Sequence, residues 1–391
     1  MLEEKLSEKI NMVCSDFELF CRYVINNNVK LSKTTWYIGK KDCFEINSLL
    51  HTKAPYEKAT HFQNLYPIIH FFYYVALKCR ILDIDYTKNV LIRGKRYQLF
   101  ERCSALEKYL ILIVYALHKP EYVEQGARVK YNIRHLMNWL WEQCATGGRE
   151  YLLSNIEFGW LIFDSMRITP ILEEMCLIKI LEKPIFERGE CHGELRIRVL
   201  PLCNLIAEVH FHISERAEPF EDENIEALIE AYTEILDSEN YSENLMKFLQ
   251  PIKPSVADQA VDLEVKIRNT DVVRVIRMNL SDTLYSLHLM IQEAVKFDND
   301  HLFMFYIGHG LFSQSYTISE AITSEDEIMA EDTELGELEL CKGTRFSYLF
   351  DFGDMWWFDI RVLDILDTIV VKPMIIKEVK QAPEQYPSYD W

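Results

Sequence analysis

The feature that most constrains the fold is a change of hydrophobic period at a segment bracketed by two prolines, residues 251–257. Upstream, apolar residues recur at the three- and four-residue spacing of amphipathic helices, beginning with residues 2–27. Downstream, residues 261–267 and 272–278 alternate between apolar and polar positions, as half-buried strands do. Because the helical period stops at the prolines, the segment is predicted to be a linker between a helical region and a separate α+β domain.

The predicted boundaries divide the chain into three folded parts and one linker. At 391 residues the chain has room for two or three domains. Residues 1–100 are expected to form a helical domain with winged-helix character. Residues 101–250 are expected to form a second helical domain with a wing-like hairpin and an acidic pair of helices. Residues 251–259 form the predicted linker, and residues 260–391 form the C-terminal domain with its tail.

The first hundred residues predict helices followed by a hairpin. Residues 64–79 have a helical apolar pattern, and residues 81–85 and 90–92 flank a turn as two short strands. This order is that of a winged helix. The hairpin is locally basic, so it is a candidate for contact with nucleic-acid phosphates, and a solvated charged hairpin is the alternative. Its candidate binding residues are Lys88, Arg93, Lys95 and Arg96.

The second helical region carries two helix-start signals and a second hairpin. Ser104 and Glu107 form a capping-box pattern, in which each side chain satisfies a free backbone N–H group of the first turn. Thr169 precedes a proline and is expected to cap a short helix. Residues 176–182 and 194–199 alternate and are expected to pair with one another. This is a second helix-then-wing arrangement.

The last domain predicts a mixed sheet on one main helix. After the two strands that follow the linker, a helix is expected through residue 295 and a third strand at residues 301–307. An acidic loop at residues 318–336 precedes a final strand pair, residues 345–350 and 356–363. This order is typical of a β-grasp-like domain. The predicted fold class is therefore α+β, with a mainly helical, wing-like N-terminal half.

Charge is divided unevenly along the chain, whose formal net charge is −19. Residues 1–200 hold 28 Lys and Arg against 24 Asp and Glu, whereas residues 201–391 hold 14 against 37. Because the acidic half would repel a polyanion, any DNA is expected to meet the N-terminal half. A protein partner of the same half is the alternative.

The sequence predicts a cytoplasmic protein with no membrane partner. The apolar runs are shorter than the roughly 20 residues that span a bilayer, and the first residues lack the pattern of a signal peptide. The ten cysteines are scattered without a Cys-x-x-Cys pair, which indicates reduced thiols rather than a zinc site.

Four short motifs stand in series in the last domain, at residues 287–292, 300–305, 346–356 and 382–387. In this order and spacing they resemble the plasmid pRiA4b open-reading-frame-three-like family, over about residues 260–388. The resemblance implies a link to bacterial mobile elements and assigns no reaction. The motif positions that it singles out are His288, Gln292, His301, Tyr348, Asp351, Gly353, Asp354, Trp356, Glu384 and Tyr386.

The chain departs from the family at one point. Members commonly carry Trp-Glu-His at the end of the third motif, whereas here Trp356 is followed by Trp357 and Phe358. An activity that used the histidine is therefore not expected in this protein.

The Asp-Phe-Gly-Asp segment of the third motif has two interpretations. In the structural one it is a tight turn in which Gly353 takes a positive φ, and Phe352 and Trp356 pack on the sheet. In the functional one, carboxylates and imidazoles converge and hold a divalent metal that activates water. The candidate ligands are Asp351, Asp354, His288 and His301, with Glu384 nearby.

Complete catalytic motifs are absent from the sequence. There is no phosphate-binding Gly-x-x-x-x-Gly-Lys loop, no Gly-x-Ser-x-Gly elbow and no His-Glu-x-x-His. Glu208, His210 and His212 would share one face only if that segment were extended. The leading expectation is a non-enzymatic binding or regulatory protein without a cofactor. A metal-dependent hydrolase or nuclease is the alternative.

Overall fold

The chain divides into two compact units, and each is described here by itself. One unit comprises Met1–Ile84 and Val90–Gln250, and the other comprises Asp85–Asn89 and Pro251–Trp391. The computed structural model describes residues 2–119, 126–144, 150–153, 168–183, 185–187, 190–192, 195–216, 228–229, 232, 242–250, 259–308, 314–318, 327–338 and 340–386. The segment 251–258 of the predicted linker, and most of the predicted acidic helical pair, lie outside these residues.

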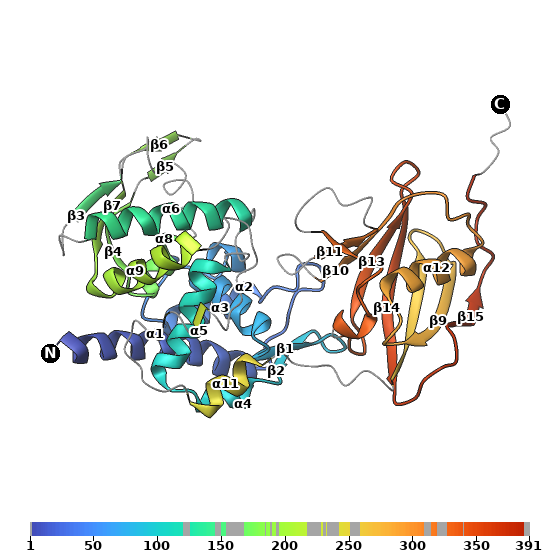
Figure 1. Cartoon of the computed structure of the whole chain (residues 1–391), viewed down its shortest axis with the longest axis horizontal. Helices are drawn as coiled ribbons and strands as arrows, with labels where there is room; N and C mark the ends of the chain where they lie inside the picture. The colour runs from blue at the N-terminus through green and yellow to red at the C-terminus, as the bar shows by residue number, and fades with distance from the viewer. Residues whose placement is uncertain are drawn as a thin grey trace. The chain divides into compact units, whose positions relative to one another are not determined.

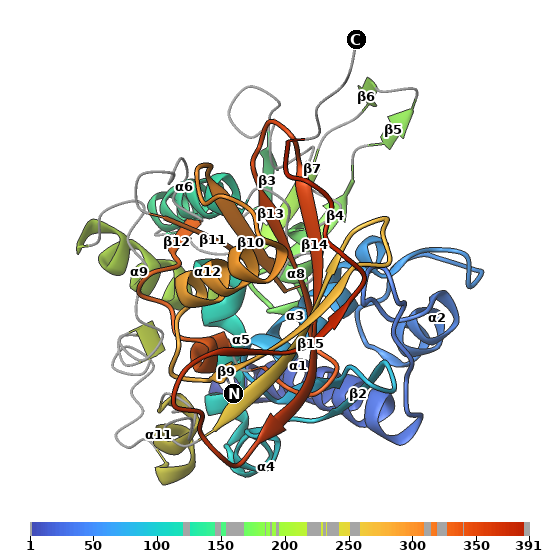
Figure 2. The same ribbon diagram turned by 90° about the vertical axis from the view of Figure 1, so that its right-hand side faces the viewer.

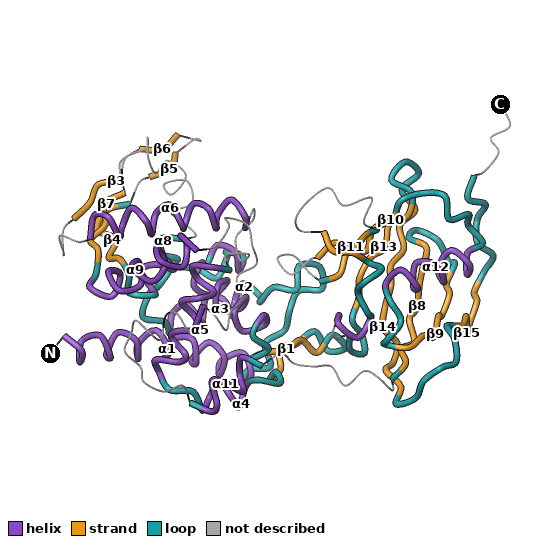
Figure 3. The backbone as a smooth tube through the Cα atoms, in the orientation of Figure 1, coloured by secondary structure: helices purple, strands orange, loops and turns teal. Residues whose placement is uncertain are grey.

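Helices make up most of the first unit, as Figure 3 shows in purple. They are α1 (Leu2–Asn26), α2 (Lys40–Leu49), η1 (Gln63–Leu65), α3 (Pro67–Lys78), α4 (Tyr97–Arg102), α5 (Ala105–His118), α6 (Gly126–Cys144), α8 (Thr169–Glu174), α9 (Pro201–Arg216) and α11 (Glu243–Leu249). Every side chain of α5 from Glu107 to His118 is buried, so this helix lies at the centre of the unit. None of the described helices has the length and apolar character needed to cross a membrane.

One of the two predicted helix starts is confirmed and the other is wrong. At α5, the Ser104 hydroxyl accepts from the Glu107 backbone N–H, and the Glu107 carboxylate accepts from the Ser104 backbone N–H. At α8, Ile168 occupies the cap position and makes no side-chain cap. Thr169 is instead the first helical residue and is fully buried, as is the cap residue Ile168.

The first unit also contains short strands that form small sheets. β1 (Leu82–Asp85) and β2 (Val90–Arg93) form the two-stranded sheet predicted for the first hairpin. β4 (Ile178–Glu182) and β7 (Leu195–Val199) pair antiparallel, which confirms the second predicted pairing. The sequence did not predict β3 (Glu150–Leu153), which pairs with β7, nor the pair formed by β5 (Ile185–Glu187) and β6 (Glu190–His192).

The extended interpretation of residues 208–212 is wrong, because the segment lies within α9. Helix positions two apart point in different directions, so His210 does not share a face with Glu208. His210 is instead buried, with its ring centroid 4.7 Å from that of His118.

The second unit is built on one mixed sheet of eight strands, in the order β12-β11-β10-β13-β14-β8-β9-β15 (Figure 1). β11 and β12 run parallel, and the other neighbouring strands pair antiparallel. The strands are β8 (Ala260–Ile267), β9 (Val273–Asn279), β10 (Phe303–Ile307), β11 (Gln314–Thr317), β12 (Glu327–Met329), β13 (Arg345–Phe350), β14 (Trp356–Leu366) and β15 (Met374–Val379). The prediction of a mixed sheet is therefore confirmed.

Part of the predicted acidic loop is ordered structure instead. Residues 327–338 contain β12 and the 3-10 helix η4 (Leu335–Leu338), while residues 319–326 lie outside the described part of the chain. Ala330 and Leu335 are fully buried in the core of the second unit. These two apolar side chains hold the segment on the sheet, whereas its acidic residues had indicated a solvated loop.

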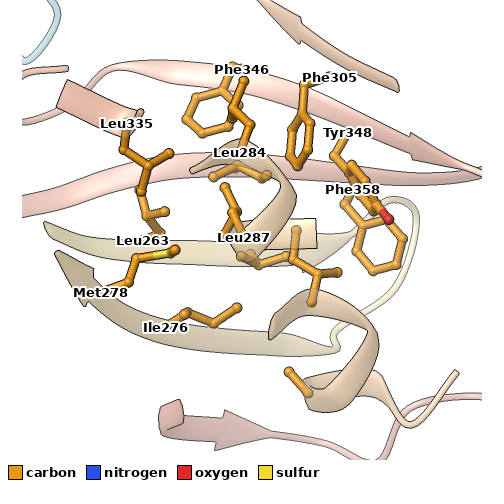
Figure 4. Close-up of a cluster of buried hydrophobic side chains, with 14 of the residues drawn as sticks. Leu263, Ile276, Met278, Leu284, Leu287, Phe305, Leu335, Phe346, Tyr348 and Phe358 are labelled. Atoms are coloured by element: carbon orange, nitrogen blue, oxygen red, sulfur yellow. The ribbon is translucent and has the colours of Figure 1, made fainter. Parts of the chain in front are cut away.

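The main helix of the second unit is α12 (Leu284–Val295), which lies against one face of the sheet (Figure 1, Figure 2). Thr283 caps it by accepting from the Ser286 backbone N–H at 3.2 Å. Leu284 and Leu287 project from the helix toward the apolar side chains of the strands, as Figure 4 shows. Burial of this face positions the polar residues of α12 that are described next.

Candidate functional site

The family-motif residues fall into two neighbouring groups in the second unit. One group is buried between α12 and β13 and contains His288, Gln292 and Tyr348. The other is formed where the segment before β10 meets the β13–β14 turn and the C-terminal tail. It contains His301, Asp351, Gly353, Asp354 and Tyr386.

A directional chain of hydrogen bonds runs through the buried group. The Gln292 amide nitrogen lies 2.7 Å from the Tyr348 hydroxyl, which lies 2.6 Å from His288 Nδ1. An amide nitrogen only donates, so the Tyr348 hydroxyl accepts from Gln292. The Asn299 Oδ1 atom only accepts, at 2.6 Å from His288 Nε2, so the ring proton of neutral His288 is on Nε2 and its Nδ1 accepts from the Tyr348 hydroxyl. The chain ties α12 to β13 and to the loop before β10.

Burial keeps this histidine neutral. Desolvation lowers the pKa of His288 to about 4, and the hydrogen bond to Asn299 opposes this only in part. The ring also stacks on Phe303, with centroids 3.9 Å apart. Burial raises the pKa of Tyr348 well above its usual range. Both groups therefore hold their protons in one fixed arrangement near neutral pH.

The β13–β14 turn is organised by the carboxylate of Asp351. Its Oδ1 accepts from the backbone N–H groups of Gly353, at 2.8 Å, and Asp354, at 3.2 Å. Asp351 itself has φ +56° and Met355 has φ +57°. The prediction that Gly353 takes the positive φ is wrong, because the left-handed residues are the aspartate that caps the turn and the methionine that ends it.

Packing around the turn only partly agrees with the structural interpretation. Trp356 is half-buried and contacts the Phe297 ring edge-on, with centroids 4.8 Å apart. Phe352, expected to pack on the sheet, is 43% exposed. At the family's histidine position Phe358 is fully buried, and its ring centroid lies 5.3 Å from that of Tyr348. An apolar ring thus stands beside the buried hydrogen-bond chain.

The C-terminal tail is held on the second group by the predicted Tyr386 together with Asp300 and Gln385, two motif residues that were not singled out. The Tyr386 hydroxyl lies 2.9 and 2.8 Å from the two carboxylate oxygens of Asp300. Gln385 accepts from the Asp298 backbone N–H at 2.6 Å and donates to Asp300 Oδ1 at 3.1 Å. These bonds lower the pKa of Asp300, with the Tyr386 bond as the largest cause. Asp300 and Gln385 lie within the second and fourth motifs, and this membership is the signal that could have singled them out.

The candidate metal ligands do not come together. His301 Nε2 lies 3.4 Å from Asp351 Oδ2, and this is the pair that the fold does assemble. Both ring nitrogens of His288 are engaged in the buried chain, and Glu384 is exposed. In the part of the chain that the structure describes, no three His, Cys, Asp or Glu residues are grouped so that they could hold a metal ion.

The basic residues of the first hairpin are only partly available to a ligand. Arg96 donates to the backbone carbonyl of Gln250 at 2.6 Å, and Lys88 pairs with Asp85 at 3.2 Å. Arg93 is an exposed residue whose guanidinium lies over the Tyr97 ring, 5.0 Å from its centroid, and Lys95 is exposed. Two of the four predicted contacts to phosphate therefore already serve the fold.

An α+β domain with a single main helix on an eight-stranded sheet is the class that these observations define. Residues 259–386 match the model of the plasmid pRiA4b ORF-3-like protein family, which confirms the resemblance of the four motifs. A crystal structure of a protein of unknown function from Methanosarcina mazei Go1 is 21% identical over 33% of this chain and 74% of that chain, with a TM-score of 0.29. No curated protein matches the chain.

Proposed function

We propose that this chain is a non-enzymatic binding or regulatory protein whose first unit contacts a protein partner. The observation that carries the proposal is that the motif side chains of the second unit are engaged in holding its fold. His288, Gln292 and Tyr348 bond to one another in the core, and Asp351 caps its own turn. A catalytic group must reach a proton or an electrophile of the substrate, and these groups already hold the helix and turn to the sheet.

The hairpin of the first unit favours a protein over a nucleic acid. Ile92 is 41% exposed, and Arg93 and Lys95 of the same hairpin segment are also exposed. A surface that mixes an apolar side chain with arginine is typical of protein–protein contacts. Affinity for DNA rises with the number of phosphates that are neutralised, and Lys88 and Arg96 are engaged elsewhere.

DNA binding through the same hairpin is the second candidate function. It is favoured by Arg93 and Lys95, two exposed basic residues at the end of β2 and just after it, on a wing-like hairpin that follows helices. This candidate includes winged-helix character for the first unit and the association with mobile elements that the family resemblance implies.

The proposal also covers the fold type of the second unit and the location of the protein. We describe the second unit as β-grasp-like because one helix packs on a mixed sheet that begins with a hairpin, β8–β9. We place the protein in the cytoplasm because seven of its cysteines are buried free thiols.

The test is site-specific photo-crosslinking in cells with the full chain. A photoreactive residue at Lys95 is expected to yield a discrete crosslinked protein, whereas the matched exposed position Lys372 of the second unit is not. Crosslinks at Lys95 that yield only nucleic acid would replace the protein proposal with the DNA candidate. No crosslink at Lys95 above the Lys372 background would reject both.

A separate measurement tests the absence of catalysis. The purified chain is incubated with DNA and RNA in the presence of manganese or magnesium, beside an Asp351→Asn variant. We expect no cleavage by either protein. Metal-dependent cleavage that Asp351→Asn abolishes, with thermal stability retained, would establish the hydrolase alternative and refute the non-enzymatic proposal.

A further inference from the structure

Two carboxyl groups are buried together in the first unit, far along the chain from any motif. Asp16 lies on α1 and Glu174 is the last residue of α8, and both residues are fully buried. Asp16 and the Thr52 hydroxyl are the nearest polar groups to the Glu174 carboxyl. The cluster therefore joins three separate segments: α1, the turn after α2, and α8.

The two carboxyl groups differ in their donors. Asp16 Oδ2 accepts from the His51 backbone N–H at 2.7 Å, and Asp16 Oδ1 lies 2.6 Å from His51 Nδ1. Within the described residues, neither oxygen of Glu174 has a hydrogen-bond partner of good geometry. A buried ionised carboxylate without donors is strongly unfavourable. A proton on Glu174 removes the charge and supplies a donor for Asp16.

We propose that Asp16 and Glu174 share one proton near neutral pH, and that this buried proton site latches α8 to α1. Glu174 is the protonated member and donates to Asp16, whose two oxygens also contact His51. Loss of the proton places two carboxylates side by side in the core, which drives α8 away from α1. Because α8 leads directly into β4, release of the latch frees the start of the three-stranded sheet.

The electrostatics of the site agree with this assignment. Burial is the largest cause that raises the pKa of Glu174, and the Thr52 side chain lowers it. The charges of Asp16 and Glu173 raise it further, and together these effects bring the pKa of Glu174 to about 8. Other groups face the end of α8 as well. They are Lys9 of α1, which acts on the neighbouring Cys176 thiol, Lys179 of β4, which pairs with Glu173, and Tyr109 of α5, which donates to the Met175 carbonyl.

The direction of the pH effect follows from the raised pKa. The folded state holds the Glu174 proton more tightly than the unfolded chain, whose glutamates have the ordinary value of 4.5. The contribution of the group to stability is therefore fully present below pH 4.5 and is lost as the pH rises through about 8. Over this window the unfolding equilibrium constant changes by about tenfold per pH unit for a one-proton difference.

The test compares wild-type full chain with Glu174→Gln and with Glu8→Gln, an exposed glutamate of α1 as matched control. Glutamine keeps the size of the protonated acid but cannot ionise. Urea unfolding of the first unit is followed from about pH 5 to about pH 9. We expect the unfolding constant of wild type and Glu8→Gln to rise relative to Glu174→Gln by about tenfold per pH unit up to about pH 8. Parallel curves for wild type and Glu174→Gln would overturn the proposal.

A second measurement decides the matter if Glu174→Gln does not fold. Wild-type chain labelled with carboxyl-13C glutamate is titrated by NMR. One glutamate carboxyl signal is expected to remain in its protonated position at pH 7 and to titrate near pH 8, and Asp16→Asn is expected to move this transition to lower pH. If every glutamate signal is ionised at pH 7, no shared proton exists.

The latch itself is read by hydrogen exchange in residues 169–182. After correction for the intrinsic pH dependence of exchange, opening of this segment in wild type is expected to increase between about pH 6 and about pH 9. Glu8→Gln should behave in the same way. Equal protection of this segment at both pH values would show that the proton does not hold α8.

Discussion

Replacement of Tyr348 by phenylalanine is the most direct test of the buried hydrogen-bond chain. The change removes a single hydroxyl and keeps the ring that packs between Phe305 and Phe358. It leaves two buried partners unsatisfied, the Gln292 amide N–H and the acceptor nitrogen of His288. No other polar group replaces the lost hydroxyl, because the surrounding core is apolar.

The magnitude follows from the two orphaned groups. Leaving one buried neutral donor or acceptor unpaired costs about 1–3 kcal/mol. The aromatic ring is retained, so the cavity contribution is small compared with this desolvation penalty. The free energy of unfolding of the second unit is therefore expected to fall by about 2–4 kcal/mol in Tyr348→Phe.

The assay must report on the second unit alone, because a chain of two units need not unfold in one step. Native-state amide exchange in α12 and β13, combined with urea unfolding, meets this requirement. Tyr306→Phe is the matched control, since in the described part of the chain the Tyr306 hydroxyl makes no hydrogen bond and lies on the opposite face of the sheet. It should change stability by less than about 0.5 kcal/mol.

Equal effects of the two substitutions would refute the reasoning. A loss in Tyr348→Phe no larger than that in Tyr306→Phe would mean that Gln292 and His288 find other partners or water. The candidate site would then lack its main structural role, and the second unit would again be open to a catalytic interpretation.

Two further predictions follow from single residues. Because the fold lowers the pKa of His288 to about 4, the contribution of His288 to stability is present above its ordinary pKa of 6.5 and is lost as the pH falls toward 4. Urea unfolding at decreasing pH should show a loss of up to about 3 kcal/mol in the free energy of unfolding, and His288→Gln should reduce this loss. Gly94→Ala places a methyl group against the Arg80 carbonyl oxygen and should destabilise the first unit by at least about 2 kcal/mol, whereas Gly39→Ala, with its nearest atom at 3.7 Å, should be nearly neutral in thermal unfolding.

The sequence predicted the strands of the second unit that bury one face. β8, β9 and β14 alternate between buried and more exposed positions over part of their length, whereas β10 and β13 are short and mostly buried apolar runs. Both patterns are visible without coordinates. β11, β12 and β15 were missed. The first two are only four and three residues long, and the third lies at the sheet edge with most of its side chains exposed. Pairing with a neighbouring strand, rather than a pattern of their own, makes these segments strands.

The candidate site was predicted as a set of residues but not as an arrangement. His288 and His301 were both possible ligands of one metal ion. In the fold, His288 lies on the buried face of α12 and bonds to Tyr348, whereas His301 precedes β10 and meets Asp351. The sequence contains no signal that separates the two, because each orientation depends on which face of its element packs against the sheet.

The sequence by itself determined the features in which the interacting residues lie within a few positions of one another along the chain. The capping box of Ser104 and Glu107, the alternation of the long strands and the turn after β13 are of this kind. Only the tertiary structure decided the contacts between residues far apart, such as the 60-residue separation of His288 and Tyr348. It also decided the protonation of His288 and Glu174, because a side chain loses its water only when distant segments close around it.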